Sequence, residues 1–225
     1  MTSYKPYDVD PVAYDNHIKI NFTTLYYPLV LHGKFNNRKN KRWKHAVDCG
    51  INKGTYSMVY AEIFDKVTSI DAVIHPKAHK QLDSIDNVNL LSHCLYSSTG
   101  DEVTFYKPED DPALGSIYKS NLFWNINDPE TQTNIIEYKL TTTKIDDIID
   151  TPIDYLKTDL EGADAEAILG AKEVISKYRP TIVTDGDYVI VKILNNLGYK
   201  KHQHAQEFCK DAIFFPEELT KEVVK

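Results

Sequence analysis

Aspartates stand at the carboxyl ends of three of the apolar segments that predict buried strands. They are Asp48, Asp159 and Asp185, and Glu161 and Asp187 follow two residues after the last two. The carboxyl ends of parallel strands meet at one edge of a sheet, where open α/β sheets bind ligands. We therefore expect these acids to gather at one crevice. Such a cluster can hold the positive sulfonium and amine of a cofactor, or a divalent cation through hard oxygen ligands.

The alternative is that these acids cap helices, a common use of aspartate at the start of a helix. Asp185 and Asp187 fit that reading well. Asp48 and Asp159 fit it poorly, because glycine-containing turns follow both of them. The first and second of the three strand ends are therefore the stronger ligand candidates.

Asp48 also opens a D-x-G-x-N-x-G motif that continues through Gly50, Asn52 and Gly54. The motif lies between an apolar strand and a helical run that begins at Thr55, and its glycines permit a tight turn and close approach of backbone to a ligand. It differs from the G-x-G-x-x-G cradle for pyrophosphate. Its acid and asparagine favour a ligand with amine, carboxylate and ribose groups, and a structural turn without a ligand is the alternative.

Strands and helices alternate through most of the chain, which predicts a parallel sheet with helices on both faces. We expect strands over residues 18–22, 45–49, 67–74, 88–93, 137–141, 153–158, 181–184, 199–202 and 212–215, and helices over 55–64, 76–84, 145–149, 163–177 and 188–197. The last two strands are expected to form an antiparallel pair at one edge.

The regular alternation breaks between residues 96 and 136. Gly100-Asp101 predicts a hairpin that pairs residues 95–96 with 103–106. The polar stretch 108–134 is long enough for a lid or binding loop, and an insertion without a ligand role is the alternative. It contains four side chains that could meet a substrate: Ser116, Tyr118, Phe123 and Trp124.

Composition limits the partners. The 225 residues are 42% hydrophobic, enough for one sizeable core, and the net charge of -7 gives no long-range attraction to nucleic acid or an anionic membrane. The three widely spaced cysteines indicate a reducing compartment. The start of the chain does not read as a signal peptide, and the apolar run 25–31 is too short to span a bilayer. We expect a cytoplasmic protein.

The D-x-G-x-N-x-G motif is followed by blocks that together form a specific pattern. The blocks are His75-Pro76, Thr143-Lys144-Ile145-Asp146, Tyr155-Leu156-Lys157-Thr158-Asp159-Leu160-Glu161-Gly162-Ala163-Asp164, Leu169-Gly170-Ala171 and Arg179-Pro180. With them, the chain resembles the FkbM family of S-adenosylmethionine-dependent methyltransferases over roughly residues 45–215.

The resemblance implies an α/β, Rossmann-like class I methyltransferase fold. Its sheet would be mostly parallel and seven-stranded, with helices on both faces and an antiparallel last strand. The chain would then consist of an N-terminal extension (1–44), a methyltransferase domain (45–216) and a charged tail (217–225). The implied activity is methyl transfer from S-adenosylmethionine to a hydroxyl of a sugar or other small molecule.

The resemblance also implies roles for single residues. It assigns Asp48, Gly50, Asn52, Gly54 and Thr55 to the methionine and ribose part of the cofactor, His75 to the position of the family's ribose-binding Glu, and Asp159 and Glu161 to the neighbourhood of the transferring methyl group. A neutral imidazole offers one donor and one acceptor, so the exchange of Glu for His75 would cost on the order of 1 kcal/mol. Asp71 is expected to lie too deep in its strand to substitute.

Several alternatives stay open at this point. The proton of an acceptor hydroxyl could pass to Asp159, Glu161 or His75, and Asp159 ranks first because it should lie at the centre of the crevice. A divalent cation held by Asp159 and Asp185 could acidify the hydroxyl instead. The chain could also be a binding module without turnover. A third reading, an RNA 2′-hydroxyl methyltransferase with a phosphate patch at 38–44, conflicts with the net charge.

Overall fold

The computed structural model describes residues 27–33, 43–109, 114–122, 134–202 and 211–220. The expected strand over 18–22, most of the basic run 36–44, and the side chains of Phe123 and Trp124 lie outside these ranges.

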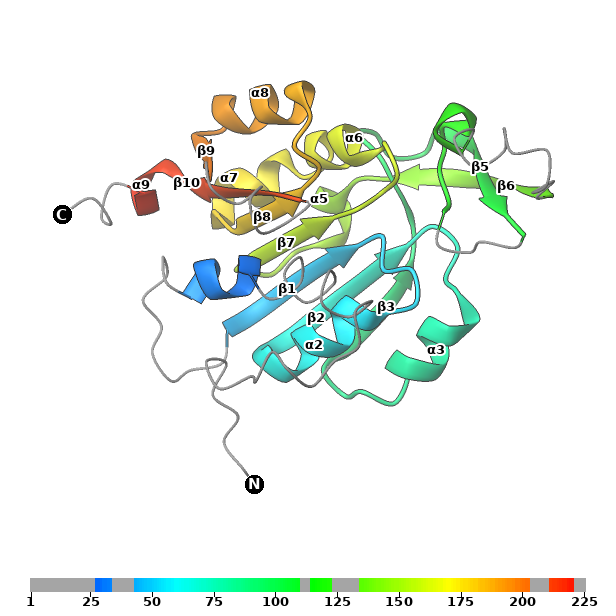
Figure 1. The fold of residues 1–225 in the computed structure, drawn as a ribbon, viewed down its shortest axis with the longest axis horizontal. Coiled ribbons are helices and arrows are strands. Elements are labelled where there is room, and N and C mark those ends of the chain that lie inside the picture. Colours follow the sequence, from blue (N-terminus) through cyan, green and yellow to red (C-terminus); the bar gives the residue numbers. More distant parts are fainter. Residues whose placement is uncertain (1–26, 34–42, 110–113, 123–133, 203–210, 221–225) are drawn as a thin grey trace.

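The protein is built from two sheets and the helices around them (Figure 1). The strands are β1 (Trp43–Cys49), β2 (Phe64–Asp71), β3 (Val88–Ser92), β4 (Cys94–Leu95), β5 (Glu102–Pro108), β6 (Ile135–Thr143), β7 (Tyr155–Thr158), β8 (Thr181–Thr184), β9 (Tyr199–Lys201) and β10 (Ala212–Pro216). The helices are α2 (Thr55–Ile63), α3 (Pro76–Leu82), the short 3-10 helix η2 (Lys119–Leu122), α5 (Ile145–Ile148), α6 (Asp164–Leu169), α7 (Lys172–Tyr178), α8 (Tyr188–Asn196) and α9 (Glu217–Thr220). A further helix covers residues 27–33.

The larger sheet has seven strands in the order β3-β2-β1-β7-β8-β10-β9. The first five strands in this order are parallel, while β10 runs antiparallel to both of its neighbours. This arrangement confirms the predicted Rossmann-like class I methyltransferase fold, including the antiparallel pair at one edge.

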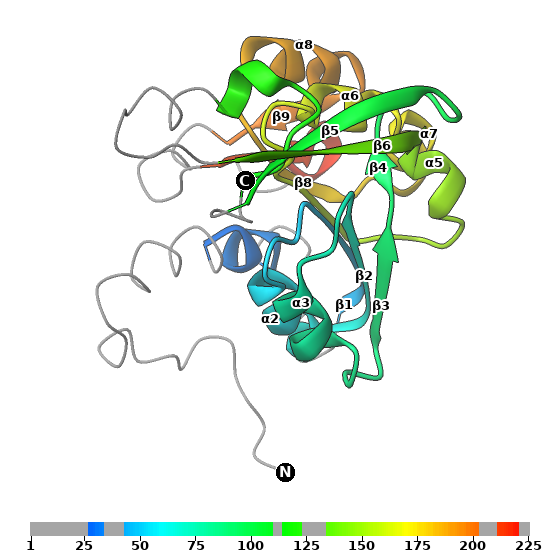
Figure 2. The ribbon, with the colours of Figure 1, turned by 90° about the vertical axis from the view of Figure 1, so that its right-hand side faces the viewer.

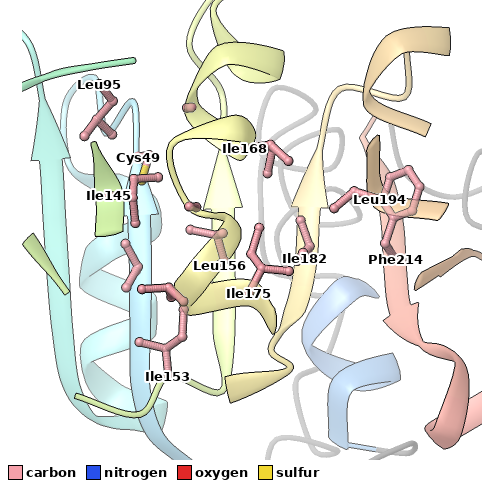
Figure 3. Packing of buried hydrophobic residues seen from close by; sticks show 14 of the residues in the cluster. Cys49, Leu95, Ile145, Ile153, Leu156, Ile168, Ile175, Ile182, Leu194 and Phe214 are labelled. Carbon is pink, nitrogen blue, oxygen red and sulfur yellow. The ribbon is translucent and has the colours of Figure 1, made fainter. Parts of the chain in front are cut away.

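Successive residues of the central strands point to opposite faces, so each strand feeds two apolar layers. Val47, Leu156 and Phe214 pack into the layer beneath α5 to α8, part of which is drawn in Figure 3. Their neighbours Ala46 and Tyr155 pack into the other layer, with α2 and the helix over 27–33. Burial on both faces explains why these strands read as continuous apolar runs.

The helix predicted over 163–177 is in fact two helices, α6 and α7. The break falls at Gly170, where an added Cβ would lie 2.1 Å from the carbonyl oxygen of Tyr96. The carbonyl oxygen of Gly170 accepts a 2.9 Å hydrogen bond from the backbone N–H of Asp146, outside the helix. Contacts with chain segments far away in sequence therefore override a continuous amphipathic pattern.

The predicted hairpin between residues 95–96 and 103–106 is wrong. Both β4 and β5 pair with β6, β4 in parallel and β5 antiparallel, and they form a separate three-stranded sheet that we call the ribbon. The Gly100-Asp101 turn exists, but it hydrogen-bonds to Thr142 of β6. The true partner lies about forty residues further along the chain, which a local turn signal cannot reveal. Figures 1 and 2 show the ribbon beyond the strand ends of the main sheet, opposite α2 and α3.

Within the described residues, no helix is both long and apolar enough to cross a membrane.

Candidate cofactor-binding and active site

A cavity lies between the carboxyl ends of β1, β2 and β7 and the ribbon. The residues that line it are Gly50, Asn52, Asp71, Ala72, His93, Cys94, Leu95, Phe105, Lys107, Gly115, Ile117, Asp159, Leu160, Glu161 and Ala163. The main sheet supplies the acids and the turn after β1, and the ribbon supplies Phe105 and Lys107. This is the edge at which open α/β sheets bind ligands.

Both glycines of the turn after β1 have a positive φ and lie close to another part of the protein. Gly50 has φ 80°, and a Cβ there would lie 1.9 Å from the carbonyl oxygen of Asp159. Gly54 has φ 87°, and its Cβ would lie 2.9 Å from a methyl carbon of Leu82. The glycines therefore let β1 and β7 end close together and let α2 begin against α3, whether or not a ligand is present.

We expect the Gly50→Ala variant to lose about 3 kcal/mol or more of unfolding free energy, because it adds a backbone clash to the strain of a positive φ. Gly100→Ala is the matched control: Gly100 has φ 98°, but its Cβ would meet nothing within 4 Å. The control should lose only about 1 kcal/mol. Urea unfolding followed by circular dichroism measures both, and equal losses would contradict the packing argument.

Asn52 is the member of this turn that presents a side chain to the cavity. It adopts φ 52°, a left-handed conformation that asparagine tolerates. Its backbone N–H donates to a carboxylate oxygen of Asp71 at 3.2 Å, while its own side-chain oxygen is buried without a hydrogen-bond partner. An unsatisfied buried acceptor is costly, so this atom fits a ligand that brings a donor.

Asp48 lies behind the turn and does not line the cavity. It is fully buried, and one of its oxygens accepts a 2.6 Å hydrogen bond from Ser57 of α2, which in turn accepts one from Ser69 of β2. Its other oxygen, Oδ1, has no hydrogen-bond partner. Burial raises the pKa of Asp48, and the nearby charge of Lys157 opposes that rise. The carboxylate thus holds the start of α2 against the sheet from inside the protein.

Gly54 and Thr55, two further residues that the resemblance assigned to the cofactor, also lie outside the cavity lining. Thr55 is exposed in the first turn of α2, and Gly54 precedes it as the N-cap. Of the predicted residues in this motif, the structure brings Gly50 and Asn52 to the cavity.

His75 is the N-cap of α3 and is not among the lining residues. Its ring Nδ1 accepts a hydrogen bond from the backbone N–H of Lys77 at 2.9 Å. Burial lowers the pKa of His75, and the lysines around it, Lys107 first, lower it further. The ring is therefore a neutral acceptor that begins a helix.

Asp71, and not His75, lies at the tip of β2. The expectation that Asp71 would lie too deep in its strand is therefore wrong. The strand was predicted to continue to residue 74, but β2 ends at Asp71. The Asp71 carboxylate accepts the backbone N–H of Val73 at 3.3 Å, a local bond that favours a turn over further strand pairing. Asp71 therefore lines the cavity at the tip of β2, and burial raises its pKa while Lys107 opposes the rise.

Lys157 places a buried cation beneath the strand ends. Its side chain is 2% exposed, and its Nζ lies 3.2 Å from Asp159 Oδ2 and 4.8 Å from the ring centre of Tyr56. Burial lowers the pKa of Lys157, but the carboxylates of Asp159, Asp48 and Asp211 outweigh burial, so its pKa is raised above the ordinary value. Lys157 is therefore an ammonium ion that fixes Asp159, whose side chain is 49% exposed at the cavity wall.

Glu161, the second predicted catalytic residue, also lines the cavity. Its backbone has φ 49°, and its carbonyl accepts hydrogen bonds from Ser116 Oγ at 2.8 Å and Asn121 Nδ2 at 2.9 Å. Ser116 is fully buried, so it holds the segment 114–122 against the site, whereas Tyr118 is 36% exposed. Asp159 and Glu161 thus both line the cavity.

Of the remaining acids, Asp187 behaves as the capping alternative predicted, whereas Asp185 is not the N-cap of a helix. Asp187 Oδ1 accepts the backbone N–H of Ile190 at 2.8 Å and caps α8. Asp185 is exposed and is not a lining residue. In the part of the chain that the structure describes, no three His, Cys, Asp or Glu side chains gather as a metal site, so the suggested divalent cation has no ligand set there.

The sequence did not indicate several of the lining residues, among them His93, Phe105 and Lys107, which carry aromatic or ionisable side chains. His93 follows β3 directly, where the carboxyl-end rule could have found it. Phe105 and Lys107 belong to β5, and they reach the cavity only because β5 pairs with β6.

The strand order, the antiparallel edge and a cavity at the carboxyl ends of β1, β2 and β7 are features of the Rossmann-like class I methyltransferase fold. A family model described as the methyltransferase FkbM domain matches residues 36–212. The chain belongs to this FkbM family of methyltransferases.

Solved structures that resemble this chain share little sequence with it. The FkbM methyltransferase from Methylobacillus flagellatus has a TM-score of 0.49 and 17% identity, covering 77% of this chain and 43% of that one. An rRNA methylase from Streptococcus thermophilus has a TM-score of 0.44 and 12% identity, covering 83% and 93%. The chain thus spans less than half the length of the Methylobacillus protein. A search of curated proteins gave no match.

Proposed function

We propose that the protein transfers a methyl group from S-adenosylmethionine to a hydroxyl of a sugar or other small molecule. The observation that carries the proposal is the row of polar groups along the cavity: Asn52 after β1, Asp71 at the tip of β2, and Asp159 after β7. Family membership gives the reaction class, and the chemistry of this row supports the cofactor.

The residues of the cavity fit S-adenosylmethionine. The unsatisfied side-chain oxygen of Asn52 suits the ammonium of the methionine part, and the carboxylate of Asp71 suits a ribose hydroxyl. The carboxylates of Asp159 and Glu161 suit the positive charge next to the methyl group. When bound, S-adenosylmethionine supplies an electrophilic methyl group.

The protein's own contribution to the reaction would be orientation and proton removal. Asp159 lies half exposed at the cavity wall, where its carboxylate can accept the proton of an acceptor hydroxyl. Lys157 holds that carboxylate in place from below. We propose a neutral, hydroxylated small molecule or glycan as the acceptor, because the carboxylates of Asp159 and Glu161 in the cavity lining would repel an anionic one.

Binding of S-adenosylmethionine and S-adenosylhomocysteine, measured by titration calorimetry, tests the proposal. We expect micromolar binding to the wild type and about tenfold weaker binding to Asn52→Gly, since glycine keeps the left-handed turn but removes the side-chain acceptor. Thr55→Ala, an exposed change in the same motif, is the control and should bind like the wild type.

Absence of binding to the wild type, with and without Mg²⁺, would contradict the proposed function and favour a binding module without turnover. If the cofactor binds, transfer of a labelled methyl group to a panel of sugars and other hydroxylated compounds identifies the acceptor. An RNA oligonucleotide in the same panel tests the remaining alternative.

A further inference from the structure

Lys107 brings a positive charge from the ribbon into the cavity. It lies in β5, opposite Ile136 of β6, and its side chain is half-buried. Its Nζ donates a 2.8 Å hydrogen bond to the carbonyl oxygen of Val73, two residues beyond the end of β2. Among the described residues that line the cavity, Lys107 is the only lysine or arginine.

The ammonium of Lys107 and the carboxylate of Asp71 share this corner of the cavity. Burial raises the pKa of Asp71 and lowers the pKa of Lys107, and the charge of each residue opposes the shift in the other. His75 also faces Lys107. An ammonium has three N–H donors, and the carbonyl of Val73 uses one of them, so the group can serve a ligand without leaving its place.

We infer that Lys107 and Asp71 together bind the ribose diol of the cofactor, with Lys107 as the donor and Asp71 as the acceptor. This inference rests on the proposed function. Each hydroxyl of a vicinal diol is both a donor and an acceptor, so a diol is matched by one carboxylate that accepts and one ammonium that donates. The ribbon then takes part in binding the cofactor as well as covering it. His75 does not compete for this role, because its Nδ1 caps α3 and the residue lies outside the cavity lining.

The position of Lys107 favours the ribose over the carboxylate of the methionine part. Lys107 contacts the segment after β2, whereas Asn52 follows β1 and Asp159 follows β7 on the other side of β1. A cofactor whose methyl group lies near Asp159 and whose amine lies near Asn52 brings its ribose toward β2.

The test compares Lys107→Met with Lys139→Met, an exposed lysine of the same ribbon that bonds to Thr104. The ligands are S-adenosylhomocysteine and 5′-methylthioadenosine, which keeps the ribose but lacks the amino-acid carboxylate, and affinities are measured by competition against labelled S-adenosylhomocysteine. We expect Lys107→Met to weaken both ligands by about tenfold. Lys139→Met should change neither by more than about twofold.

Equal binding by wild type and Lys107→Met would overturn the inference and leave the proposed function intact. Weakening of S-adenosylhomocysteine alone would also overturn it, because Lys107 would then bind the carboxylate. If the wild type binds neither ligand, the proposed function fails and the inference fails with it. Lys107→Arg keeps the cation and should stay within about threefold of the wild type, which separates loss of charge from loss of folding, together with a thermal melt of each variant.

Discussion

Replacing Lys157 with methionine is expected to destabilise the protein by about 3–5 kcal/mol at pH 8. Methionine keeps the length and packing of the side chain but removes the cation that faces Asp48, Asp159, Asp211 and the ring of Tyr56. Asp48 is fully buried, so its carboxylate would lose its strongest electrostatic support without gaining water. Breaking a buried pair by removing one partner is costly for this reason.

The loss in Lys157→Met should depend on pH in a defined direction. Burial already raises the pKa of Asp48 in the folded protein, and removal of Lys157 raises it further. A carboxyl group whose pKa is higher in the folded than in the unfolded state contributes stability that is fully present below the unfolded pKa and is lost as the pH rises through the folded pKa. The deficit of Lys157→Met relative to wild type should therefore shrink as the pH falls from 8 to 5.

Urea unfolding of both proteins at pH 8 and pH 5 measures this prediction. The double variant Asp48→Asn, Lys157→Met should recover part of the loss at pH 8, because it removes the buried charge as well as its partner. Lys66→Met, an exposed lysine on β2, is the control and should cost less than about 0.5 kcal/mol. A deficit below about 1 kcal/mol that stays constant with pH would show that Lys157 is not a structural counter-ion.

Local patterns located the strands of the main sheet, and the family resemblance gave their number and the antiparallel last strand. Strand β8 was predicted without error because Arg179-Pro180 ends the preceding helix and four buried residues follow. Lys157 stands two residues before Asp159 in the sequence, and the 3.2 Å contact between them is likewise local. These features depend on neighbours in sequence or on the alternation of a single strand.

The ribbon and its part of the cavity could not be predicted, because they depend on partners far apart in the chain. Lys107 looks like an ordinary strand lysine until β5 pairs with β6 and carries it to Val73, thirty-four residues earlier in the sequence. The end of β2 was misplaced for a related reason: Ala72, Val73 and Ile74 continue an apolar pattern. The bond from the Val73 N–H to Asp71 ends the strand before that pattern does.

Replacing Asp159 with asparagine is expected to slow methyl transfer to a hydroxyl acceptor by about 10²- to 10⁴-fold. The amide keeps the size of the side chain but cannot take a proton. Asp159 lines the cavity and its side chain is half exposed, so its carboxylate is accessible to an acceptor bound there. The measurement is single-turnover transfer of a labelled methyl group to the acceptor found by screening, with S-adenosylhomocysteine affinity measured in parallel.

Two matched variants decide what a slow Asp159→Asn variant means. Asp185→Asn removes an exposed carboxylate after the next strand, outside the cavity lining, and should leave the rate within about twofold of wild type. Glu161→Gln removes the other carboxylate that the segment after β7 contributes to the cavity lining. If Glu161→Gln shows the large loss and Asp159→Asn does not, the proton acceptor is Glu161, and Asp159 serves to hold Lys157. If both variants lose rate but keep their affinity for S-adenosylhomocysteine, both carboxylates act in the transfer step and neither is needed for cofactor binding.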